Sequence, residues 1–146
     1  MPKVISTFAG MGGSSLGYCM AGFEELLAVE WDPHAAGIFR MNFPGAHLMQ
    51  KDINEVAGQE ILDICHLAQG DLDVLDGSPP CQGFSMSGRR KVNDTRNALF
   101  SQFVRLVNEI QPKVFIMENV TGMIKGKMRG QFIEIMGTLQ GLNYQV

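Results

Sequence analysis

Hydrophobic and polar residues along the chain form short apolar runs that alternate with longer amphipathic stretches. The apolar runs predict five strands, at residues 3–10, 25–32, 46–53, 71–80 and 113–119. The amphipathic stretches predict five helices, at residues 15–23, 34–43, 54–69, 97–111 and 131–142. In the fourth of these, the residues spaced along one helical face are Leu99, Phe103, Leu106 and Ile110. Residues 143–146 predict the beginning of a further strand.

Regular alternation of strands and helices is typical of an α/β fold with a mostly parallel, doubly wound sheet. A chain of 146 residues, 45% of them hydrophobic, can form one core, and no segment looks like a linker or a repeat. We therefore expect a single domain over residues 1–146. The apolar runs fall short of the ~18 residues of a membrane span, and the amino terminus does not resemble a secretory signal. We expect a soluble, intracellular protein with no membrane partner.

The net charge of −3 does not by itself suggest a nucleic-acid-binding protein, but the charges are unevenly distributed. Acidic side chains outnumber basic ones in residues 1–88, and basic side chains outnumber acidic ones in residues 89–129. Two interpretations are open, an ordinary solvated surface or a rim that faces phosphates. The rim would consist of Arg89, Arg90, Lys91, Arg96, Lys125, Lys127 and Arg129.

Doubly wound sheets bind their ligands at the carboxyl ends of the strands. The residues expected there are the glycine-rich segment 8–17, Glu30 with Trp31, Asp52 with Ile53, Pro79 to Cys81, and Glu118 with Asn119. All five strand ends would face one crevice.

The first of these segments favours a nucleoside ligand. Gly10, Gly12 and Gly13 let the backbone approach a ligand closely and direct a helix amino terminus at it. A dinucleotide fingerprint would need a further glycine where this chain has Ser15, which weakens a nicotinamide or flavin interpretation. Glu30 follows Gly10 at the spacing of an acid that binds ribose hydroxyls. In addition, Trp31 offers a face for stacking on a purine and Asp52 an acceptor for an exocyclic amine.

Cys81 lies in the segment GSPPCQGFS, residues 77–85, directly after two prolines. The loop that follows is rich in glycine, serine and basic residues, so we expect an exposed, electropositive setting that favours a nucleophilic thiolate. The alternative is a small buried hydrophobic residue. The three cysteines, Cys19, Cys65 and Cys81, lack metal-ligand spacing, so we expect neither a disulfide framework nor a metal site.

Glu118 ends the apolar run KVFIME, residues 113–118. Partial burial there would desolvate the carboxylate and favour its protonated form, as proton transfer requires. The alternative is an acid that caps a helix or forms an ion pair.

Six segments resemble, in this order, successive motifs of the cytosine-5 DNA methyltransferases: FAGMGG, EWD, KDI, GSPPCQGFS, DTRNALF and MENV. The resemblance covers the whole chain and implies a Rossmann-like catalytic domain that binds S-adenosylmethionine. It assigns Glu30 to the ribose, and Trp31, Asp52 and Ile53 to the adenine. The other residues that it places around the cofactor are Phe8, Ala9, Gly10, Met11, Gly12, Gly13, Pro80, Asn97, Leu99 and Phe100.

The same resemblance implies methyl transfer to carbon 5 of a cytosine flipped out of DNA. Cys81 would be the nucleophile that adds to carbon 6, and Glu118 would hydrogen-bond or protonate ring nitrogen 3. Asn119 and Val120 would shape the pocket. The residues expected to follow the DNA phosphates are Ser85, Ser87, Arg89 and Arg90.

Three features of the family are missing from these residues: an arginine-bearing motif, a target-recognition domain and a final helix that packs beside the cofactor site. We therefore expect a truncated catalytic domain that is inactive alone. It would be a truncated chain or gene remnant, a subunit of a split enzyme completed by a second polypeptide, or a fragment that only binds cofactor.

Two other functions remain open. One is a tRNA cytosine-5 methyltransferase, although Gly83 and Ser85 fit the DNA enzymes better. The other is a non-catalytic S-adenosylmethionine-binding module, which would not need Cys81 and Glu118. A DNA enzyme would belong to a restriction-modification system in the bacterial or phage-infected cytoplasm, or would act in a nucleus.

Overall fold

The computed structural model describes residues 1–79, 97–118, 129–142 and 144–146. Its strands are β1 Lys3–Thr7, β2 Glu24–Val29, β3 His47–Met49, β4 Val74–Gly77 and β5 Val114–Met117. Its α-helices are α1 Gly13–Met20, α2 Pro33–Asn42, α3 Gly58–Cys65, α4 Asn97–Ile110 and α5 Arg129–Gly141. A short 3₁₀ helix, η1, covers Ile53–Glu55.

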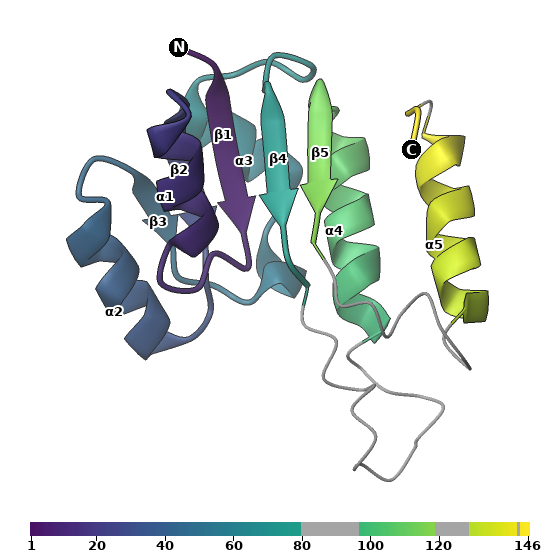
Figure 1. Ribbon diagram of the computed structural model, residues 1–146, viewed down its shortest axis with the longest axis horizontal. Coiled ribbons are helices and arrows are strands. Elements are labelled where there is room, and N and C mark those ends of the chain that lie inside the picture. Colours follow the sequence, from purple (N-terminus) through teal and green to yellow (C-terminus); the bar gives the residue numbers. More distant parts are fainter. Residues whose placement is uncertain (80–96, 119–128, 143) are drawn as a thin grey trace, which may run out of the picture.

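The five strands form one parallel sheet in the order β3-β2-β1-β4-β5. Helices α1 and α2 lie on one face of the sheet, and α3 and α4 lie on the other (Figure 1). After β3 the chain crosses to the far side of β1 and continues with β4, so the winding direction reverses between β1 and β4. The prediction of a parallel, doubly wound α/β fold is confirmed, and the reversal marks the place where such sheets bind ligands.

The main hydrophobic core fills the space between the sheet and helices α3 and α4. Ile5, Leu27 and Leu75 of the three central strands are fully buried there. The predicted apolar face of α4 packs against them, with Phe103, Leu106 and Ile110 buried and Leu99 partly buried. The helical spacing of these four residues therefore identified the buried face of α4 correctly.

A bulge in the pairing of β1 with β2 changes which side chains face α1. The register shifts by one residue between Val4 and Ile5, so Leu26 has no partner on β1. Leu27 consequently packs in the core on the α3 side, while Glu25 bonds to Ser6 on the α1 side. On that same side no described helix covers β4 and β5 (Figure 1). Val114 and Ile116 of β5 are exposed.

Two predicted elements differ from the structure. The helix expected over residues 54–69 is instead η1, an extended stretch at Val56 and Ala57, and the shorter helix α3. His66, with a φ of 53°, takes the left-handed conformation that ends α3.

Residues 144–146, the described part of the strand expected at the carboxyl end, have no regular structure. Tyr144 instead packs its ring against Phe115 and donates its hydroxyl to the Pro112 carbonyl oxygen at 2.6 Å.

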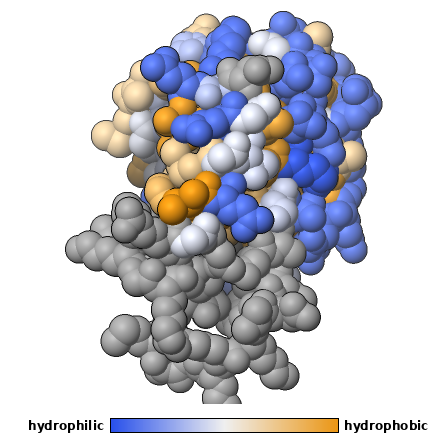
Figure 2. All heavy atoms as spheres, turned by 90° about the vertical axis from the view of Figure 1, so that its right-hand side faces the viewer, coloured by the Kyte–Doolittle hydropathy of each residue, from blue (hydrophilic) through white to orange (hydrophobic). Residues whose placement is uncertain are grey.

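The side of the molecule that carries α5 has a mixed surface. Figure 2 shows hydrophobic residues interspersed with hydrophilic ones there, and Ile133 of α5 is 60% exposed. Within the part of the chain that the structure describes, no helix is long and apolar enough to cross a bilayer.

Candidate active site

The carboxyl ends of all five strands lie at the same end of the sheet, because every strand pair is parallel. Backbone hydrogen bonds join the segments that leave these ends. The N–H of Ala9 donates to the Val29 oxygen at 3.1 Å, and that of Glu30 donates to the Met49 oxygen at 3.1 Å. The N–H of Glu118 donates to the Gly77 oxygen at 3.1 Å. These bonds bring together the strand ends at which the sequence predicted ligand-binding residues.

The glycine-rich segment after β1 forms a tight turn with a left-handed backbone. Phe8 and Gly10 both have a φ of 55°, which is unfavourable for phenylalanine. Gly12 has a φ of 93°, and a Cβ built there would lie 2.3 Å from Cε2 of Phe43. Asn42 donates its side-chain amide to the Met11 oxygen at 3.0 Å. The end of α2 therefore supports this turn, and Gly12 is required by the Phe43 ring.

Helix α1 begins directly after this turn. Gly12 is its amino-terminal cap and offers no side-chain acceptor to the first turn. The N–H groups at the start of an α-helix lack intrahelical partners and carry a partial positive charge. This end of α1 can therefore bind a carboxylate or another anion.

Glu30 at the end of β2 connects two backbone segments. Its Oε2 accepts a hydrogen bond from the N–H of Gly10 at 2.7 Å, and its Oε1 accepts one from the N–H of Asp32 at 2.8 Å. The side chain is only 7% exposed. Each carboxylate oxygen can accept a further bond, so Glu30 can hold the glycine turn and still bind a pair of hydroxyls.

Apolar side chains beside Glu30 are open to solvent. Trp31 is 71% exposed and Met11 is 58% exposed, although both are large hydrophobic residues. Asp32, next in sequence, caps α2 by accepting bonds from His34 and Ala35. The cap fixes the start of α2 and leaves the Trp31 ring available for stacking.

Asp52 and Ile53 follow β3 but differ in environment. Asp52 is exposed and caps η1, with Oδ1 accepting a bond from the N–H of Asn54 at 2.9 Å. Ile53 is 5% exposed and belongs to the main core. Asp52 is therefore free to meet a ligand, whereas the Ile53 side chain mainly holds this segment on the core.

Helix α4 contributes its amino-terminal end. Asn97 begins the helix, Leu99 is partly buried, and Phe100 is 3% exposed. Phe103 packs so closely on Gly77 of β4 that a Cβ at Gly77 would lie 2.4 Å from its ring. Gly77 thus lets α4 approach the strand end from which the Cys81 segment departs.

Glu118 lies at the end of β5, as expected, but it is exposed. The expectation that it is partly desolvated is therefore wrong for the described residues. Glu118 continues the alternation of the exposed residues Val114 and Ile116, which lie on the face of β5 that no described helix covers.

The remaining predicted site residues lie outside the described residues, and their roles stay predictions. They are Pro80, Cys81, Ser85, Ser87, Arg89, Arg90, Asn119 and Val120. The same is true of the basic residues Lys91, Arg96, Lys125 and Lys127, and of the side chain of Arg129. Among the residues that are described, no cluster of His, Cys, Asp and Glu could hold a metal ion.

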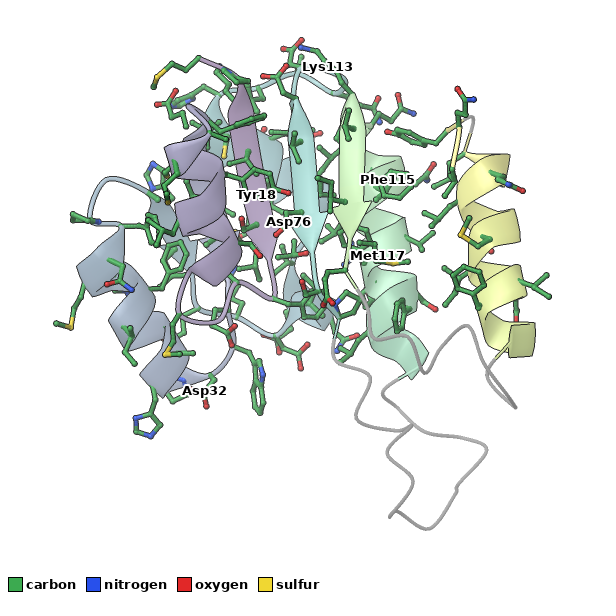
Figure 3. All side chains as sticks on the ribbon, in the orientation of Figure 1. Tyr18, Asp32, Asp76, Lys113, Phe115 and Met117 are labelled. Atoms are coloured by element: carbon green, nitrogen blue, oxygen red, sulfur yellow. The ribbon has the colours of Figure 1, made fainter. Side chains whose placement is uncertain are left out.

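A buried polar cluster between α1 and the sheet was not predicted from the sequence. Tyr18 of α1 and Asp76 of β4 point toward one another, with the Tyr18 hydroxyl 3.1 Å from Oδ1 of Asp76 (Figure 3). Oε2 of Glu25 accepts a bond from Ser6 at 2.9 Å, while its buried Oε1 has no partner among the described residues. Burial raises the pKa of Glu25 to about 7, and it also raises the pKa of Asp76 and of Tyr18. Glu24 and Glu25 are two adjacent acids where an apolar run begins, and no pattern in the sequence marked either as buried.

Known proteins resemble this chain over most of its length. The family model of the C-5 cytosine-specific DNA methylases matches residues 2–146. Type II methyltransferase M.XorII of Xanthomonas oryzae pv. oryzae is 40% identical over 145 residues, which cover 99% of this chain and 34% of that protein. Type II methyltransferase M1.HphI of Haemophilus parahaemolyticus is 42% identical over 148 residues, which cover 97% of this chain and 38% of that protein. The chain therefore spans between a third and two fifths of the length of these relatives.

A solved structure agrees with these matches. A protein described as a DNA modification methyltransferase encoded within an E. coli prophage superimposes with a TM-score of 0.82 at 37% identity. The similarity covers 97% of this chain and 38% of that one. Since the family model matches nearly every residue, the chain belongs to the C-5 cytosine-specific DNA methylase family.

Proposed function

We propose that this chain is the cofactor-binding and catalytic part of a DNA (cytosine-5-)-methyltransferase. The reaction would transfer a methyl group from S-adenosylmethionine to carbon 5 of a cytosine flipped out of DNA. The observation that carries the proposal is the convergence of Glu30, the glycine turn, Trp31 and Asp52 at the carboxyl edge of the sheet, in a chain of this family.

The described residues fit a cofactor that combines an amino acid, a ribose and an adenine. The uncapped amino terminus of α1 suits the carboxylate of the amino-acid part. Glu30 can accept bonds from both ribose hydroxyls while it holds Gly10. The exposed Trp31 ring can stack on the adenine, and Asp52 can accept a bond from its amine. The pocket wall would be completed by Phe8, Ala9, Met11, Gly12, Gly13, Ile53, Pro80, Asn97, Leu99 and Phe100.

When bound, S-adenosylmethionine supplies an activated methyl group. The Cys81 thiolate would add to carbon 6 of the cytosine, and the electron pair of the 5,6 double bond would make carbon 5 nucleophilic. Glu118 would hold a proton at ring nitrogen 3, where negative charge develops. After carbon 5 has accepted the methyl group, a base would take its proton, the electron pair of that bond would restore the 5,6 double bond, and the bond from carbon 6 to sulfur would break to release the Cys81 thiolate.

DNA is the proposed substrate, because the matching family model is that of the C-5 cytosine-specific DNA methylases and the similar prophage protein is described as a DNA modification methyltransferase. Ser85, Ser87, Arg89 and Arg90 would contact its phosphates, and Asn119 and Val120 would border the flipped base. Target recognition would come from a region like those that the longer relatives have outside the matched part, or from a second polypeptide. The enzyme would act in a restriction-modification system.

The cofactor proposal is tested by isothermal titration of the 146-residue chain with S-adenosylhomocysteine, the demethylated product. We expect saturable one-to-one binding. Clear binding of NAD with no heat from S-adenosylhomocysteine would overturn the proposal.

The catalytic proposal is tested with DNA that contains 5-fluorocytosine, whose carbon 5 cannot lose a proton. The chain is assayed alone and together with a polypeptide that supplies the target-recognition region. We expect a covalent protein–DNA adduct that Cys81→Ser abolishes and that the control Cys19→Ser, at an exposed cysteine of α1, leaves intact. An adduct that survives Cys81→Ser would remove Cys81 from the proposed role.

A further inference from the structure

Arg105 of α4 makes hydrogen bonds to a segment that lies about fifty residues earlier in the chain. Its Nη2 donates to the backbone oxygen of Ile53 at 3.1 Å and to that of Val56 at 2.8 Å. Its Nε donates to the side-chain oxygen of Gln102 at 2.7 Å, which orients the guanidinium from within α4. One side chain thus connects α4 to the turn that follows β3.

Glu109, one helical turn further along α4, strengthens this connection. Nη1 of Arg105 lies 2.9 Å from both Oε1 and Oε2 of Glu109. Oε2 of Glu109 also accepts a bond from the N–H of Gly58 at 2.6 Å, which satisfies a free donor in the first turn of α3. A Cβ at Gly58 would lie 2.5 Å from Cβ of Glu109, so only glycine allows this approach. Arg105 and Glu109 together hold both ends of the segment 53–58.

The position of this segment relates the contact to the cofactor site. Ile53 directly follows Asp52, and the Asp52 side chain caps η1. Arg105 binds the same turn through the backbone oxygen of Ile53. The opposite end of α4 begins at Asn97 and carries Leu99 and Phe100, which the proposed pocket also uses. Arg105 therefore joins the two elements that would border the adenine.

We propose that Arg105 is a positioning residue for the adenine side of the cofactor pocket, an inference that rests on the proposed function. It fixes the backbone at Ile53 and Val56, and so sets the place of the Asp52 carboxylate relative to the start of α4. The flat guanidinium is required because it serves two carbonyls and one carboxylate simultaneously. A lysine ammonium at position 105 could reach the carboxylate or a carbonyl, but it lacks the fixed fork that spans all three.

The test compares the affinity of S-adenosylhomocysteine with that of its analogue without the exocyclic amine of adenine. Titrations use the 146-residue chain as wild type, Arg105→Met, Arg105→Lys and the control Lys51→Met. Lys51 lies next to the same segment and forms an ion pair with Glu60 at 2.5 Å, but it bonds to neither carbonyl. Circular dichroism verifies that each variant is folded at the temperature of the titration.

In the wild type, loss of the amine should weaken binding about tenfold or more, because a hydrogen bond to a charged acceptor is lost. In Arg105→Met the ratio of the two dissociation constants, that of the analogue without the amine to that of S-adenosylhomocysteine, should fall to about twofold or less. The affinity for S-adenosylhomocysteine itself should also be weaker. The ratio for Arg105→Lys should lie between those of the wild type and Arg105→Met, and Lys51→Met should keep the wild-type ratio. If Arg105→Met does not fold, the ratio of Arg105→Lys decides the matter.

Two outcomes separate the inference from the proposed function. Failure of the wild-type chain to bind S-adenosylhomocysteine would overturn both. Normal binding by the wild type, with an unchanged ratio in folded Arg105 variants, would overturn the positioning role alone. In that case Arg105 would contribute to stability only, and its variants would melt at lower temperature while they keep the wild-type preference for the amine.

Discussion

Replacement of Glu25 by glutamine should change how the stability of the fold depends on pH. Glu25 lies under α1, 7% exposed, and it accepts a bond from Ser6. Other groups around it are Ser15 of α1 and Asp76 of β4, and neither supplies positive charge. Burial raises the pKa of Glu25 from its usual 4.5 to about 7. The folded protein therefore binds this proton more tightly than the unfolded chain does.

The sign and size of the effect follow from this difference. Below about pH 4.5 the group is protonated in both states and has no effect on stability. As the pH rises to about 7, the unfolded chain releases the proton first, so the free energy of unfolding falls. A rise of the pKa from 4.5 in the unfolded chain to about 7 in the folded protein corresponds to a total loss of about 3 kcal/mol in the free energy of unfolding, which is complete above the folded-state pKa.

The measurement is urea denaturation of wild type and Glu25→Gln between about pH 4 and pH 8. The amide cannot ionise and can still accept the Ser6 bond, so the variant lacks this loss. Wild type should lose about 3 kcal/mol relative to the variant over this range. Asp76 is present in both proteins, and the repulsion between its charge and that of Glu25 is part of the loss that only the wild type shows. Glu24→Gln, at the exposed neighbour, is the control, and parallel curves for wild type and Glu25→Gln would refute the reasoning.

Three further changes test the site and its support. Glu30→Ala should weaken S-adenosylhomocysteine binding by about 1.5–3 kcal/mol in isothermal titration, because a charged acceptor is lost; unchanged affinity would contradict its role. Gly77→Ala should reduce the free energy of unfolding by about 1–3 kcal/mol in urea, because its methyl group would meet Phe103 and Thr7. DNA affinity from residues 89–129 should fall steeply with salt in fluorescence titrations; a flat response would exclude phosphate contacts.

Local pattern was enough for the sheet and for the edge that carries the site. Each strand is a short apolar run, and the parallel topology follows from the helices between the runs. Glu30 and Asp52 could be assigned to strand ends because Glu30 directly follows β2 and Asp52 lies three residues after the end of β3. Their convergence is then a property of parallel sheets and needs no knowledge of distant contacts.

Long-range contacts account for what pattern could not predict. The expected helix 54–69 is interrupted at Val56, whose carbonyl bonds to Arg105 from another helix. Glu118 is exposed together with Val114 and Ile116 on the face of β5 that no described helix covers, and a single apolar run cannot show which face is covered. The support of Gly12 by Phe43 likewise joins residues thirty-one positions apart, and nothing in either local sequence indicates it.

The unpaired Leu26 of β2 determines which changes of chain length the sheet can tolerate. In a regular strand Glu25 and Leu27 would point to the same face, and the extra residue lets them point to opposite faces. Deletion of Leu26 would restore one-to-one pairing with β1 and leave Glu25 beneath α1 and Leu27 in the core. Deletion of Ala28 would instead turn either Leu27 or Val29 away from the core. Deletion of one residue should therefore disturb β2 least at Leu26, where the alternation of side chains between the two faces of the sheet is already interrupted.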